Sequence, residues 1–157
     1  MRHLTAALLT AALLVPVPAF AGASEDAYLS RLVGVWSGKG TLSGAETGKV
    51  SCTLTIRQRT DGVNFSVKCE VPEFGPQNFS GVISYNDATG KYEARSSGGD
   101  VTVGAKKGSS IVFTADMKGM AEGTSVMTIS NSRVVVDATV RRPGGTADIK
   151  SHIEMTR

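Results

Sequence analysis

The stretch KVSCTLTIRQRTDGVNFSVKCEV, residues 49–71, decides the fold of this chain. Apolar residues occupy every second position on both sides of the turn signal TDG at 60–62, and this period of two is typical of strands with one buried face. The segment therefore predicts an antiparallel β-hairpin. If the first two residues of the turn form the loop, Cys52 lies directly opposite Cys69 on the same face. The Cα atoms of such partners are about 4.5 to 5.5 Å apart, which suits a disulfide, so we expect a Cys52–Cys69 bond.

The same alternation continues along the rest of the chain. Short segments of period two are separated by turns that mostly contain Gly or Asn, and before them the segment SEDAYLSRLVG, residues 24–34, has apolar residues at helical spacing. We expect an all-β, antiparallel up-and-down β-barrel of about nine or ten strands with a short N-terminal helix, because closure removes exposed strand edges. Besides the hairpin, strands are expected at 35–42, 78–85, 91–97, 101–106, 110–118, 123–130, 133–141 and 146–156.

The first residues have the pattern of a secretory signal peptide. A basic start is followed by a short apolar run and by the small-residue sequence AFA at 19–21, which predicts a signal peptide over residues 1–21. Residues 22–157 are then expected to form a single lipocalin-like β-barrel domain in a periplasmic or secreted bacterial protein. An oxidising compartment of this kind also favours the disulfide.

The distribution of charged and aromatic residues argues against nucleic-acid binding and against insertion into a membrane. The 17 basic and 14 acidic residues nearly balance, and no basic stripe with aromatic platforms is present, so nucleic-acid binding is not expected. An outer-membrane barrel would carry girdles of aromatic residues at both interfaces, whereas the aromatic residues here are scattered. We therefore do not expect an integral membrane protein.

The segment GVWSGKG, residues 34–40, contains the only tryptophan, Trp36, and the last residue is Arg157. The first three residues resemble the G-x-W that opens the first strand of lipocalins. The whole segment is similar to the G-x-W-x-G-x-G opening of nitrobindin-like bacterial barrels, which often end on an arginine. This resemblance implies that Trp36 plugs one end of the barrel and that a basic side chain, here Arg157, packs on its ring.

The strand phases predict a mainly aliphatic inner face. Among the later strands, Val101, Val103 and Ala105 are expected to point inward. Non-catalytic binding of a small apolar or amphiphilic molecule inside the barrel is the function that this face favours. The residues expected to contact such a ligand are Phe65, Val67, Ile111, Phe113, Met127, Val136 and Ile153. The alternative is a filled barrel with a structural or protein-interaction role, such as an inhibitor or scaffold in the envelope.

Catalysis and cofactor binding have little support in the sequence. The chain lacks the G-x-S-x-G and H-E-x-x-H motifs, so we expect no enzymatic activity, no catalytic residues and no metal site. In nitrobindin-like barrels, heme is bound by an inward histidine of the last strand. His152 alternates with Ile153 and is expected to point outward, so heme binding through His152 is only the third alternative and no cofactor is expected.

Overall fold

The computed structural model describes residues 21–71, 75–117, 122–141, 144 and 147–157. In this part of the chain a helix, α1 (Ala21–Ser30), precedes ten strands. They are β1 (Gly34–Gly44), β2 (Gly48–Arg59), β3 (Gly62–Val71), β4 (Gly75–Asn86), β5 (Lys91–Ser96), β6 (Val101–Lys107), β7 (Ser110–Met117), β8 (Glu122–Ile129), β9 (Val134–Arg141) and β10 (Ile149–Thr156).

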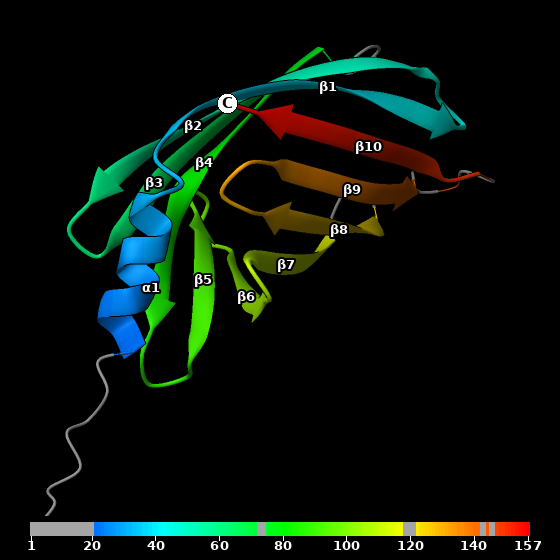
Figure 1. Ribbon diagram of the computed structural model, residues 1–157. Helices are drawn as coiled ribbons and strands as arrows, with labels where there is room; N and C mark the ends of the chain where they lie inside the picture. Colours follow the sequence, from blue (N-terminus) through cyan, green and yellow to red (C-terminus); the bar gives the residue numbers. More distant parts are fainter. Residues whose placement is uncertain (1–20, 72–74, 118–121, 142–143, 145–146) are drawn as a thin grey trace, which may run out of the picture.

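The strands form one closed antiparallel barrel. Each strand pairs with the next along the chain, and β10 closes the barrel by pairing with β1 (Figure 1). The predicted fold class is therefore confirmed, including the short helix on the N-terminal side. No helix within the described ranges combines the length and the apolar character needed to cross a lipid bilayer.

The β2–β3 hairpin has the register that its sequence predicted. Arg59 pairs with Gly62, and Cys52 pairs with Cys69. The two cysteines are joined by a disulfide, with their Cα atoms 4.1 Å apart. Both side chains are buried, so this covalent link between neighbouring strands belongs to the inner layer of the barrel.

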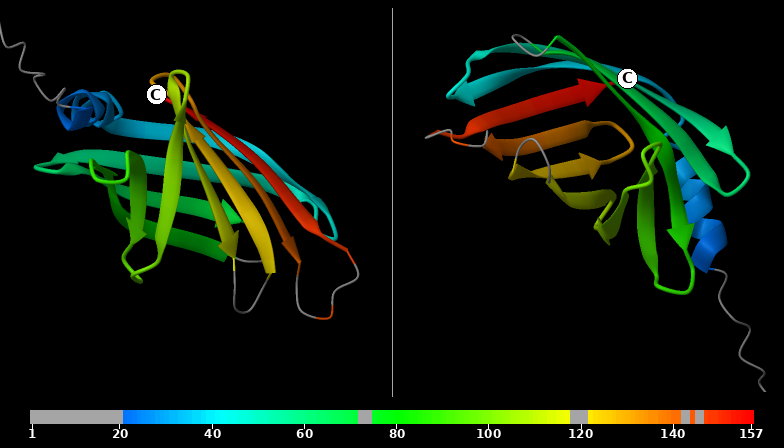
Figure 2. Two further views of the ribbon diagram at one scale, coloured as in Figure 1. Left: turned by 90° about the horizontal axis from the view of Figure 1, so that it is seen from below. Right: turned by 180° about the vertical axis from the view of Figure 1, so that it is seen from behind.

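Helix α1 lies across one end of the barrel, which we call the helix end (Figure 2). The helix was expected at residues 24–34, but it spans Ala21–Ser30, because a turn over residues 31–33 leads the chain into β1. Leu29 and Leu32 are fully buried against the core, so the apolar spacing of this segment serves to close the barrel. The expected signal peptide lies almost wholly outside the described residues.

One predicted strand phase is wrong. Val101 and Val103 of β6 were expected to point inward, but they are 44% and 55% exposed, whereas Gly104 is buried. The reason is the ring of Phe113 on the paired strand, which occupies the space next to Gly104. A Cβ at that glycine would lie 2.6 Å from the ring, so the pair requires Gly104 on the inner face and turns the valines outward.

Candidate functional site

The inner face of the barrel changes from closed to accessible along its axis. At the helix end its residues are fully buried, as with Val63, Ile111 and Val134. Farther along the same strands, the next inward residues are partly exposed, and this change recurs on β3, β4, β7, β8, β9 and β10. Strand β2 differs, because its inner face is buried almost throughout, and burial also returns beyond the accessible stretch at Cys69 of β3, Ile149 of β10 and Leu42 of β1. The accessible inner surface, as we define it, consists of Phe65, Val67, Phe79, Ser125, Met127, Val136, Ala138, Ser151 and Ile153.

The structure divides the seven predicted ligand-contact residues into two groups. Ile111 and Phe113 are 0% and 2% exposed and belong to the packed core at the helix end. The other five are partly exposed and pack with one side against that core: Phe65, Val67, Met127, Val136 and Ile153. Cross-strand pairing places Met127, Val136 and Ile153 in one row across β8, β9 and β10.

Phe79 is a member of this surface that the sequence reasoning missed. It pairs with Val67 across β3 and β4, so the two side chains lie on the same face, yet Phe79 is 58% exposed. The sequence pattern does indicate that Phe79 points inward, because it alternates in phase with Ile83, whose side chain is buried. Between them, Gly81 leaves room for the ring of Phe65, since a Cβ there would lie 2.8 Å from that ring.

The polar groups of this set of residues are hydroxyls, and the partly exposed amide of Gln77 lies on the same face, since Gln77 pairs with Cys69. Ser125 and Ser151 belong to the accessible inner surface, and no residue of this surface has an ionisable side chain. The surface is therefore apolar, with a few neutral hydrogen-bonding groups, which is the usual composition of a site for a small lipophilic molecule.

At the helix end, the structure brings Trp36 and Arg157 together. Trp36 is fully buried, and its indole Nε1 donates a hydrogen bond to the carbonyl oxygen of Leu32 at 3.0 Å. The guanidinium carbon of Arg157 lies 4.3 Å from the centroid of the indole ring, and the same group donates to the carbonyl oxygens of Val33 and Asn131. These contacts join Arg157 to the segment that leads into β1 and to the turn between β8 and β9.

A polar cluster fixes α1 to the barrel at the same end. Lys106 Nζ lies 2.8 and 2.7 Å from the two carboxylate oxygens of Glu25, and the Tyr92 hydroxyl donates to the same carboxylate. Burial raises the pKa of Glu25, but the hydrogen bonds from Lys106 and Tyr92 and the positive charges of Lys106 and Arg31 lower it more, so the net pKa is lowered. Burial, followed by the bond to Glu25, raises the pKa of Tyr92. This cluster holds the helix in place.

His152 lies on the outer face of the barrel. Its Nδ1 is 2.6 Å from Asp137 Oδ1, and both side chains are 59% exposed. The imidazole therefore does not belong to the accessible inner surface. Within the described residues, no three His, Cys, Asp or Glu side chains are grouped closely enough to hold a metal ion.

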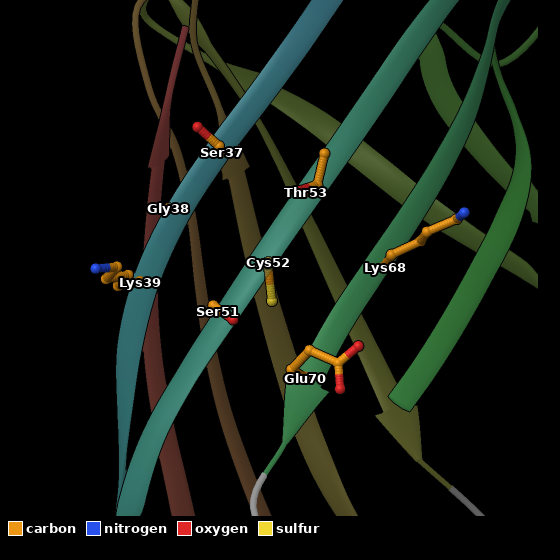
Figure 3. Close-up of a pocket in the computed structure, with 8 residues that line it drawn as sticks. All are labelled: Ser37, Gly38, Lys39, Ser51, Cys52, Thr53, Lys68 and Glu70. Atoms are coloured by element: carbon orange, nitrogen blue, oxygen red, sulfur yellow. The ribbon is translucent and has the colours of Figure 1, made fainter. Parts of the chain in front are cut away.

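A depression of about 360 Å³ lies on the wall formed by β1, β2 and β3 (Figure 3). Most of the side chains around it belong to the outer face, including Ser37, Lys39, Thr53 and Lys68. Figure 3 shows the two lysine side chains pointing away from one another, so their charges do not converge on one position. The accessible inner surface is the better candidate site.

Comparison with known proteins supports the architecture. No protein-family model and no curated protein sequence matches the chain. Among solved structures, the chain is similar to the S-type phycobiliprotein lyase CPES from Guillardia theta, with a TM-score of 0.60 and 14% identity over 85% of this chain and 92% of that one. It is also similar to Rv2717c from M. tuberculosis, with a TM-score of 0.56 and 13% identity over 88% of this chain and 98% of that one.

The first of these neighbours overturns one expectation from the sequence. The lack of hydrolase and metal motifs in the sequence predicts that the protein is not an enzyme, but a barrel with this fold is named as a lyase. That exclusion is therefore wrong, because the motifs it relied on belong to other folds and say nothing about chemistry inside a barrel. At these identities the two neighbours establish a shared fold, an antiparallel barrel consistent with the lipocalin-like class.

Proposed function

We propose that the protein binds a small apolar or amphiphilic molecule inside the barrel, on the accessible inner surface. The observation that carries this proposal is the partial exposure of apolar side chains that face inward, above all Phe79. In a barrel filled for a purely structural role, these residues would be buried like those at the helix end. The solved structure of a phycobiliprotein lyase with this fold suits the proposal, since it is a barrel that is named for an activity.

The energetics of such binding are adequate without charged contacts. Removing apolar surface from water contributes about 25 cal/mol per Å², so a ligand that buries about 300 Å² gains roughly 7 kcal/mol before the entropy cost of association is subtracted. Heme bound through His152 forms no part of the proposal, because that imidazole lies on the outer face beside Asp137. We also propose that the protein is exported, which the signal-like residues 1–21 and the disulfide support. The GVWSGKG segment supports the further proposal that the barrel is nitrobindin-like.

A titration with an environment-sensitive lipophilic dye tests this function. Saturable uptake is expected, and Phe79→Ala should weaken it about threefold or more. Val103→Ala provides a matched control, because Val103 is 55% exposed, close to the 58% of Phe79, but lies on the outer face. Absence of saturable uptake, or an equal loss in both variants, would contradict binding inside the barrel.

A further inference from the structure

Two serines face the barrel interior on either side of strand β9. Ser125 of β8 and Ser151 of β10 are both cross-strand partners of Ala138, so all three side chains point to the inner face. Both serines are partly exposed. Because Ala138 ends at its Cβ, no longer side chain separates the two hydroxyls. They form a short polar row on a surface that is otherwise apolar.

Neither hydroxyl is used by the fold. Among the described residues, the side chains of Ser125 and Ser151 take part in no hydrogen bond with another group. A serine hydroxyl offers one donor and two acceptor positions, so each can bind a carbonyl, ester or hydroxyl oxygen of a ligand. Neighbouring strands are about 4.8 Å apart, which places the two serines roughly 10 Å apart across β9, so one oxygen atom cannot reach both. The row suits a polar group with more than one oxygen.

Within the part of the chain that the structure describes, no ionisable side chain belongs to the accessible inner surface. Among the described residues, the basic side chains on the inner side at the helix end are already engaged, Lys106 with Glu25 and Arg157 with Trp36. A carboxylate or phosphate bound beside the serines would lose its water without gaining a positive partner from the described residues of this surface, which is strongly unfavourable. A neutral ligand avoids this cost.

We infer that the ligand of the accessible inner surface is a neutral lipophile with hydroxyl or ester oxygens, held by Ser125 and Ser151 while its apolar part contacts the phenylalanines of β3 and β4. This inference rests on the proposed function and narrows it to uncharged molecules. The two serines then determine specificity, and Phe65 and Phe79 supply apolar contact.

The test compares two probes with the same twelve-carbon acyl chain, glycerol monolaurate and laurate, as competitors of the lipophilic dye on the full chain. At pH 7.5 glycerol monolaurate should displace the dye at concentrations at least tenfold lower than laurate. At pH 4, where more of the laurate is protonated, this difference should shrink. Glycerol monolaurate measured at both pH values controls for changes in the protein itself.

Two serine variants and one control complete the design. Ser125→Ala and Ser151→Ala should each weaken the binding of glycerol monolaurate about three- to tenfold, which is the usual effect of losing one neutral hydrogen bond. The binding of laurate at pH 7.5 should stay unchanged. Ser66→Ala is the control, because Ser66 is also partly exposed but lies on the outer face of β3. Equal displacement by both probes, with silent serine variants, would overturn this inference and leave the proposed function intact. Absence of dye uptake in the wild-type protein would overturn both.

Discussion

Replacement of Trp36 measures how far closure of the helix end stabilises the barrel. The indole ring is fully buried, donates a hydrogen bond to the Leu32 carbonyl and lies beneath the Arg157 guanidinium. Trp36→Ala removes the ring and leaves a cavity, and we expect it to lower the free energy of unfolding by about 3 to 5 kcal/mol.

Two further variants separate the contributions. Trp36→Phe keeps most of the apolar contact but leaves the buried Leu32 carbonyl without its donor, which should cost about 1 to 3 kcal/mol. Arg157→Ala removes the cation above the ring. Because Arg157 is largely exposed, its loss should cost only about 1 kcal/mol.

Urea unfolding followed by far-UV circular dichroism provides the measurement, since Trp36→Ala and Trp36→Phe remove the only tryptophan and with it the fluorescence signal. With a slope of about 2 kcal/mol per M, Trp36→Ala should lower the midpoint by about 2 M and Arg157→Ala by about 0.5 M. Phe79→Ala serves as the control, because its ring is 58% exposed and contributes less to the core. A Trp36→Ala midpoint within about 0.3 M of the wild-type value would refute the assigned role of the ring.

Three other perturbations have defined outcomes. Replacing Cys52 and Cys69 together by Ala should lower stability by about 3 kcal/mol, since the bond closes a loop with a sequence separation of 17, and intact-mass analysis of the alkylated wild-type protein without reductant should find no labelled thiol. The lowered pKa of Glu25 means that its carboxylate stabilises the fold above its ordinary pKa and that this contribution is lost as the pH falls through the lowered value. Glu25→Gln or Lys106→Met should therefore be less stable near pH 7, and Glu25→Gln should lose less additional stability between pH 5 and 3 than the wild type, measured by thermal unfolding. Gly38→Ala should strongly destabilise the barrel, because the new Cβ would collide with the backbone of β10, and circular dichroism should show a melting temperature lowered by well over 5 °C.

The fold could be predicted because the alternation of apolar residues and the turn signals can be recognised within short segments of the sequence. In the β2–β3 hairpin, the alternation and a two-residue turn together fix the register, so the pairing of Cys52 with Cys69 follows from residue positions alone. Strand β6 could not be assigned in the same way. Its apolar residues lie on the outer face, and the feature that sets its phase, the fit of Phe113 against Gly104, joins two strands and is invisible within either one.

The candidate site was predictable only in part, for a related reason. Period two identifies which residues point inward, and this was correct for Met127, Val136 and Ile153. It does not indicate how deep along the barrel axis a residue lies. Ile111 has the correct phase but is buried at the helix end, whereas Phe79 is accessible, and that difference depends on where α1 covers the barrel.

The pairing of β1 with β10 also constrains the order of events during folding. Every other strand pair joins neighbours along the chain, but this pair brings together segments from opposite ends of the described chain. Contacts of such long sequence separation have a high entropic cost of loop closure and form slowly. Arg157 can reach Trp36 only after β10 has paired with β1. The fluorescence of the single tryptophan therefore reports when the barrel closes. In a refolding experiment this fluorescence should reach the native value after the circular dichroism signal of the hairpins has already formed.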